Sequence, residues 1–197
     1  MQPFREANAA RIRYLTDDEI QKLLAAVEGA FGYLVRGALH TGARYGELAS
    51  LRVKDFNAAT QTVFVAKSKN GKARSIHLTH EGVEFFRGIC SGGEGGEILF
   101  LREDGRPWGQ SHQVRHMVEA TRHADLSEAV SFHQLRHTYA SHAAMNGMPL
   151  MVLAGNLGHS DTRMVEKHYG HMSDEYRRLA IQRTALQPSK SLSTRGT

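Results

Sequence analysis

The stretch Ser131-Phe-His-Gln-Leu-Arg-His-Thr138 sets an imidazole and a permanent cation three residues apart. Residues at this spacing are neighbours on a helix surface, so His133 and Arg136 are predicted to share one helix face. Apolar residues that recur from Phe132 onward predict that this helix packs on a core, with Ser131 as its N-cap. An anchored pair of this kind can hold an oxyanion while a proton moves, which is what chemistry at a phosphodiester requires.

The composition is that of one basic domain. The chain has 197 residues, with 25 Lys and Arg against 20 Asp and Glu, which favours a polyanionic partner such as nucleic acid. Many soluble proteins are equally basic, so charge alone does not decide this. The single cysteine, Cys90, excludes an internal disulfide and a zinc site built from several cysteines. Because the sequence lacks a signal peptide and a long apolar run, we expect a cytoplasmic, nucleoid-associated protein without a membrane partner.

Helical patterns surround a short segment with the composition of β-strands. Residues 62–66 and 73–77 are predicted strands on either side of Asn70-Gly71, a strong signal for a β-hairpin. We therefore predict an α+β fold that is mainly helical, with helices around a small antiparallel sheet. The polar residues 1–13 indicate the remnant of a linker, and the composition of residues 188–197 indicates a disordered tail.

A second basic position lies where one predicted helix ends and a short one begins. Arg44 stands at the start of that short helix, beside backbone N–H groups that have no partner within the helix. Donors and positive charge gathered at one point favour a phosphate oxygen. The other interpretation is a surface arginine paired with Glu47 one turn along the helix.

The predicted hairpin tip carries three lysines, Lys67, Lys69 and Lys72. Lysines at such a position often keep a strand edge solvated and so block aggregation. In a DNA-binding protein, the same tip can enter a groove and bring an ammonium group to a particular oxygen. Both interpretations are open from these residues alone.

Two more short motifs, Leu157-Gly-His159 and Tyr169-x-His171, follow the Ser131 helix. Together with Thr41-Gly-Ala-Arg44-x-x-Glu47, the lysine hairpin and the His133 motif, they resemble the tyrosine recombinase (phage integrase) family. Each motif is weak by itself, but all five occur in the order of the family. The resemblance extends over nearly the whole chain.

This resemblance implies roles for individual residues. Arg44 and Arg136 look like the arginines that clamp the two non-bridging oxygens of a scissile phosphate. Tyr169 looks like the nucleophile that forms a 3′-phosphotyrosyl enzyme, and His133 like the residue that handles its proton. His159 resembles the position that hydrogen-bonds the phosphate and supports the pocket.

The remaining members of the set are one lysine and three supporting residues. Lys69 is similar to the hairpin lysine that protonates the leaving 5′-oxygen, with Lys67 and Lys72 as alternatives. Simple structural roles are an equal alternative for the three residues that resemble supports of the site, which are Glu47, His137 and His171.

The resemblance also implies the activity and the partners. We expect a site-specific DNA recombinase or integrase that cleaves and rejoins double-stranded DNA without a cofactor or a metal. The family acts as a homo-tetramer on synapsed DNA, whereas we expect a monomer for this chain. Residues 14–187 correspond to the catalytic domain of the family, and we expect its N-terminal core-binding domain to be absent.

Three other functions share some of these sequence features. A type IB topoisomerase-like enzyme shares the chemistry but relaxes supercoils without pairing sites. A non-catalytic DNA-binding derivative of a recombinase is disfavoured because all six principal groups are present. A zinc hydrolase could use some of the twelve histidines, but the spacing of His133 and His137 lacks the His-Glu-x-x-His pattern of such enzymes.

Overall fold

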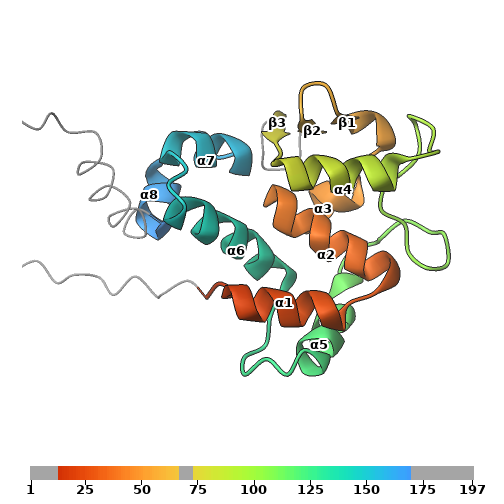
Figure 1. Cartoon of the computed structure of the whole chain (residues 1–197), viewed down its shortest axis with the longest axis horizontal. Coiled ribbons are helices and arrows are strands. Elements are labelled where there is room, and N and C mark those ends of the chain that lie inside the picture. Colours follow the sequence, from red (N-terminus) through yellow and green to blue (C-terminus); the bar gives the residue numbers. More distant parts are fainter. Residues whose placement is uncertain (1–12, 67–72, 170–197) are drawn as a thin grey trace, which may run out of the picture.

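The computed structural model describes residues 13–66 and 73–169, which form helices around one small sheet (Figure 1). The first part of the chain contains α1 (Asp17–Ala26), α2 (Gly29–Thr41), α3 (Tyr45–Ala49), a 3₁₀ turn (Val53–Asp55), β1 (Phe56–Asn57) and β2 (Thr62–Val65). The second part contains β3 (Arg74–His77), α4 (His80–Cys90), α5 (Gln113–His123), α6 (Phe132–Met145), α7 (Leu150–Leu157) and α8 (Arg163–Tyr169). The predicted fold class is confirmed.

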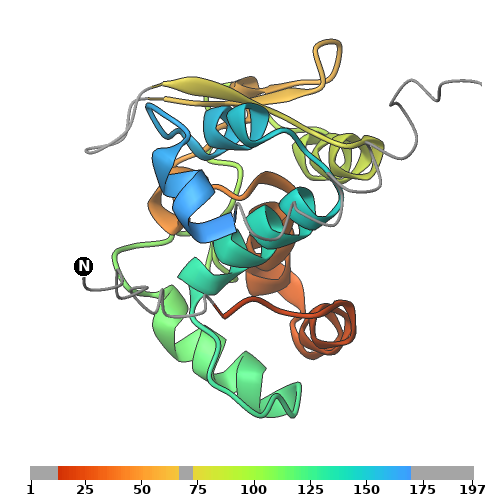
Figure 2. The ribbon, with the colours of Figure 1, turned by 90° about the vertical axis from the view of Figure 1, so that its left-hand side faces the viewer.

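The sheet is antiparallel with strand order β1-β2-β3. Val63 pairs with Ile76 and Val65 pairs with Arg74, so the two strands predicted to flank the hairpin turn are confirmed. Alternation along β2 directs Val63 and Val65 into the core. Helix α7 lies beside β3 (Figure 2).

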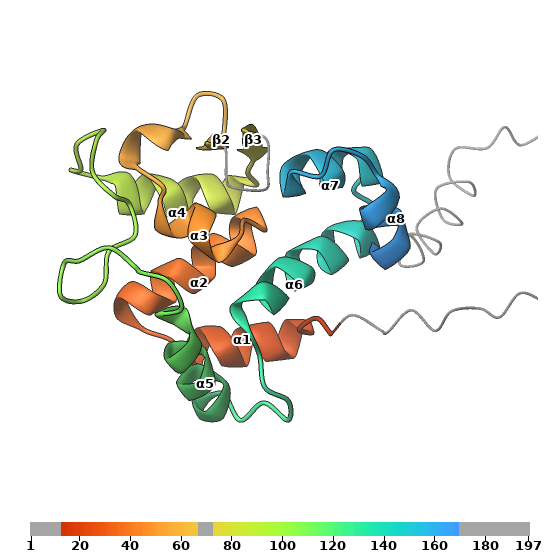
Figure 3. The same ribbon diagram turned by 180° about the vertical axis from the view of Figure 1, so that it is seen from behind.

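Two apolar clusters hold the fold together. The larger cluster joins α1, α2, α4 and α5 to the sheet and includes Leu135 from the first half of α6. The smaller cluster joins the second half of α6, from Ala140, to α7 and α8, and it contains Tyr169. Helix α6 therefore runs from one cluster to the other, as the view from behind shows (Figure 3).

Local sequence signals explain where several helices begin and end. Thr16 and Glu19 form the reciprocal capping box that starts α1. Gly42 ends α2 in the left-handed conformation, with φ of 62°. A Cβ atom at Gly42 would lie 2.4 Å from the ring of Tyr139 on α6, so the close approach of α2 to α6 also requires glycine. This approach brings the residues after Gly42 next to α6.

None of the helices in the two described ranges combines the length and the apolar character that are needed to cross a membrane.

Candidate active site

Arg44 is the N-cap residue of α3, as the sequence predicted. Its Nη1 donates to Oε1 of Glu47 at 3.0 Å, while its backbone N–H donates to Oε2 at 2.9 Å. The predicted Arg44–Glu47 pair is therefore present. The side chain of Arg44 is nevertheless 36% exposed, in contrast to the buried carboxylate.

Arg136 is buried and held by main-chain acceptors. Its Nη1 donates to the carbonyl of Gly42 at 2.9 Å, and its Nη2 donates to the carbonyl of Leu157 at 2.7 Å. The same Nη2 lies 3.3 Å from Nε2 of His159. Burial, and then the charge of Arg44, lower the pKa of Arg136 to about 10, so the group is still a cation at neutral pH. Two neighbouring cations of this kind attract a shared anion.

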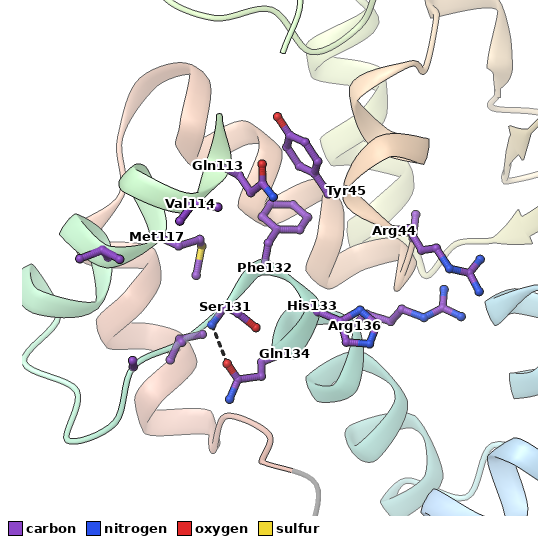
Figure 4. A pocket seen from close by; sticks show the side chains of 14 residues that line it. Arg44, Tyr45, Gln113, Val114, Met117, Ser131, Phe132, His133, Gln134 and Arg136 are labelled. Atoms are coloured by element: carbon purple, nitrogen blue, oxygen red, sulfur yellow. Dashed lines mark hydrogen bonds between the residues drawn. The ribbon is translucent and has the colours of Figure 1, made fainter. Parts of the chain in front are cut away.

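Arg44, His133 and Arg136 line one cavity of about 400 Å³. Figure 4 shows the two guanidinium groups close together at one end, with the ring of His133 next to Arg136. The other end is apolar and is lined by side chains such as Val114 and Met117 of α5. The structure therefore brings together three residues that are distant in the sequence, since Arg44 and Arg136 are 92 positions apart.

Two histidines of α6, His133 and His137, form a row of imidazoles beside the arginines. The rings of His133 and His137 meet edge to face, with centroids 4.6 Å apart. Desolvation of its ring, and then the charges of Arg136 and Arg44, lower the pKa of His133. Burial is also the main reason that the pKa of His137 falls to about 4, with smaller effects of neighbouring charges. His137 is therefore neutral at pH 7.

Tyr169 ends α8 and is 4% exposed. Its phenol oxygen and Nδ1 of His137 share a hydrogen bond of 2.5 Å. Burial raises the pKa of Tyr169 to about 12 although Arg136 acts in the opposite direction, so the phenol is protonated at neutral pH. Tyr169 is not among the described residues that line the arginine cavity. The phenol is therefore held by His137 rather than by His133, which had been predicted to handle its proton.

Four predicted residues, Lys67, Lys69, Lys72 and His171, lie outside the described residues. The three lysines lie in the sequence between β2 and β3, whose last paired residues are Val65 and Arg74. His159 follows α7, whose left-handed cap Gly158 has φ of 73°, and it reaches Arg136 as described above. Glu47 contacts Arg44 directly.

Sequence reasoning missed Arg74, which occupies the first position of β3. Its Nη1 and Nη2 donate to the two oxygens of Glu47 at 3.1 and 2.8 Å. Burial by itself raises the pKa of Glu47, but hydrogen bonds from Arg74 and Arg44 outweigh it and lower the pKa to about 2. The sequence signal for this residue is its position two residues before Ile76, so that both side chains face the core side of the strand. A charged side chain on that side needs a partner.

The sequence matches a known protein family over most of its length. The pattern that defines the phage integrase family matches residues 13–176. The chain belongs to the phage integrase family. The integrase of Escherichia phage P2 is 31% identical over 176 residues, which cover 88% of this chain and 47% of that protein. The chain spans about half the length of the first phage integrases that it matches.

Solved structures of this family share the fold. The catalytic domain of bacteriophage HP1 integrase superposes with a TM-score of 0.68 at 25% identity, covering 91% of this chain and all of that domain. The integrase of the transposon Tn1549, solved in complex with transposon right end DNA, superposes with a TM-score of 0.71 at 21% identity over 92% of this chain and 69% of that one. The chain thus has the fold of the family's catalytic domain.

Within residues 13–66 and 73–169, no three His, Cys, Asp or Glu side chains lie close enough together to hold a metal ion.

Proposed function

We propose that this chain cleaves and rejoins double-stranded DNA through a covalent 3′-phosphotyrosyl intermediate, as a site-specific recombinase or integrase. The observation that carries this proposal is the pairing of two guanidinium groups on one cavity with a buried phenol on the neighbouring imidazole row. This combination supplies an anion site, a nucleophile and proton carriers from α6 and the elements around it.

Arg44 and Arg136 are the proposed phosphate clamp. Negative charge builds on the non-bridging oxygens as phosphorus is attacked, and fixed guanidinium groups stabilise it without losing their protons. Arg136 is held in place by two carbonyl groups, and Arg44 by Glu47. The clamp is thus fixed before any substrate arrives, which is the condition under which electrostatic stabilisation is most effective. His159, at 3.3 Å from Arg136, is proposed to donate a further hydrogen bond to the phosphate.

Tyr169 is the proposed nucleophile. Its oxygen attacks phosphorus and forms the new P–O bond while the bond to the 5′-oxygen breaks. The phenol proton passes to an imidazole, and the leaving 5′-oxygen takes a proton from Lys69. Because the phenol starts on His137, outside the arginine cavity, it must move toward the phosphate before attack, and His133 lines that cavity and is the proposed proton acceptor there.

Double-stranded DNA is the proposed partner. The net charge of +5 favours a polyanion, and the Tn1549 integrase, which shares the fold, was solved with transposon DNA. This chain covers about half the length of its phage relatives. Assembly into a homo-tetramer on paired sites is therefore proposed for a longer protein that contains it.

The test is covalent trapping on nicked duplexes tiled across the DNA that flanks the encoding gene. A nick just 3′ of the scissile phosphate lets the short fragment that carries the released 5′-hydroxyl diffuse away, so that a covalent protein–DNA adduct accumulates. We expect an adduct with the wild-type chain, with or without EDTA, and none with Tyr169→Phe, which should still bind the same duplex in a gel-shift assay.

The outcomes separate the alternatives. An adduct that persists in Tyr169→Phe would refute the nucleophile assignment. DNA binding without any wild-type adduct would instead indicate a non-catalytic DNA-binding derivative. Relaxation of a supercoiled plasmid with no joining of two sites would favour a topoisomerase-like activity.

A further inference from the structure

Arg74 connects three parts of the site. Its two terminal nitrogens donate to both oxygens of Glu47, at 3.1 and 2.8 Å, and its Nε donates to the carbonyl of Asn156 on α7 at 2.7 Å. The side chain is 8% exposed, and that of Glu47 is 2% exposed. We propose that Arg74 is a positioning residue that keeps Arg44 available to the scissile phosphate, an inference that rests on the proposed function.

The first step in the argument is the number of donors around Glu47. Oε1 accepts from Nη1 of Arg44 and from Nη1 of Arg74, while Oε2 accepts from Nη2 of Arg74 and from the backbone N–H of Arg44. An ionised carboxylate offers about four lone-pair sites, so these four donors fill it. Arg44 therefore engages Glu47 through a single side-chain nitrogen, and its other donors are left for a ligand.

The second step is what Arg44 does when Arg74 is removed. Arginine and carboxylate groups pair most strongly through two parallel hydrogen bonds. Arg44 lies beside the like charge of Arg136, and a carboxylate with one free lone-pair site on each oxygen offers relief from that repulsion. Arg44 then turns onto both oxygens of Glu47 and away from the phosphate site. Arg74 prevents this by occupying the remaining lone-pair site of each oxygen.

The third step concerns the neighbouring elements. Arg74 is the first residue of β3, directly after the strand connection that carries the lysines. Through Asn156 it also fixes the end of α7 that leads to His159. One buried side chain thus sets the spacing between the strand pair, the Arg44 turn and the loop of His159, without itself lining the arginine cavity.

The experiment compares Arg74→Met, Glu47→Gln and the double variant on the nicked duplex that traps wild-type adduct. We expect Arg74→Met to slow adduct formation at saturating DNA on the order of 10- to 100-fold, the effect of a misplaced catalytic group. The double variant should be faster than Arg74→Met, because the neutral amide no longer captures Arg44. The matched control is Arg87→Met, which removes an exposed arginine paired with Glu84 on α4 and should cleave at the wild-type rate.

A double variant as slow as Arg74→Met, or slower, would mean that Arg74 has only a structural role and would overturn the inference. A crystal structure of Arg74→Met decides the same question without DNA, since Arg44 should pair with both oxygens of Glu47. An unchanged single contact overturns the inference even if cleavage fails for other reasons. If Arg74→Met does not fold, Arg74→Lys serves instead, because one ammonium group cannot replace both donors of the guanidinium fork and Arg44 should again pair with both oxygens.

Discussion

The two halves of the candidate active site are held in different ways. The arginine cavity is fixed by charged and main-chain contacts, because Arg136 donates to two carbonyls and Glu47 accepts four hydrogen bonds. The nucleophile half is fixed by one hydrogen bond, between Tyr169 and His137, and by the smaller of two apolar clusters. The groups that stabilise charge are therefore in place, while the proposed attacking group is stored to one side.

This difference suggests how the proposed cleavage is restrained. A phenol with a pKa of about 12 on a neutral imidazole is a poor nucleophile, so the resting site does not attack phosphate by itself. Moving Tyr169 costs the free energy of one hydrogen bond and of repacking a small apolar cluster. This cost is modest compared with that of breaking the buried ion pairs of the arginine cavity.

The largest effect is expected in the fixed half. Arg136→Lys keeps the charge, but one ammonium group cannot serve two carbonyls and a phosphate in the geometry of a guanidinium fork. We expect the rate of adduct formation to fall about 100-fold or more, the usual loss for one transition-state donor. Arg115→Lys, an exposed arginine with a single partner, Glu119, is the control. A variant rate close to wild type would contradict a clamp that depends on Arg136.

An intermediate effect is expected from the imidazole of His137. Its pKa is about 4 in the folded chain against 6.5 as the ordinary value, so between these values the unfolded chain binds a proton that the folded chain does not. The free energy of unfolding therefore decreases as the pH falls from 6.5 to 4. After allowance for partial exposure, this group contributes about 1–2 kcal/mol.

Urea denaturation at several pH values checks this. Between pH 6.5 and 4, the free energy of unfolding of His137→Asn should decrease by about 1–2 kcal/mol less than that of the wild type. The remaining loss comes from other groups with lowered pKa values, such as His133, His159 and Glu47. Equal pH profiles for the two proteins would show that protonation of His137 does not oppose the folded arrangement.

The smallest effect is expected from the phenol hydroxyl. Tyr169→Phe removes one hydrogen bond and should lower the free energy of unfolding by about 0.5–1.5 kcal/mol. Tyr45→Phe, which removes a 2.7 Å hydrogen bond to the carbonyl of Gly109, is a matched control in the other half of the molecule. Thermal or urea denaturation measures both. A Tyr169→Phe chain more stable than wild type would indicate that the hydrogen bond to His137 does not hold the phenol in place.

Much of the fold follows from short-range signals. The Thr16 capping box, the Gly42 helix end and the strands around Asn70-Gly71 act within a few residues of chain, so each could be read from sequence. The family motifs likewise pointed to Arg44 and to the helix that begins at Phe132. Both are where they were predicted to be.

Other features depend on partners distant in the sequence. Arg74 lies 27 residues from Glu47, and Tyr169 lies 32 residues from His137. No local pattern states which of two adjacent imidazoles holds the phenol, or that one carboxylate serves two arginines. Those outcomes depend on how α6, α7, α8 and β3 pack.

The sequence by itself determined the class of fold, the two strands of the hairpin, the starts of the helices at Arg44 and Ser131, and the set of charged and aromatic groups available for chemistry. Only the tertiary structure decided which of these groups meet. The physical reason is that capping and strand alternation are local properties of the backbone, whereas a buried charge takes whichever partner the packing of the whole chain brings within hydrogen-bonding distance.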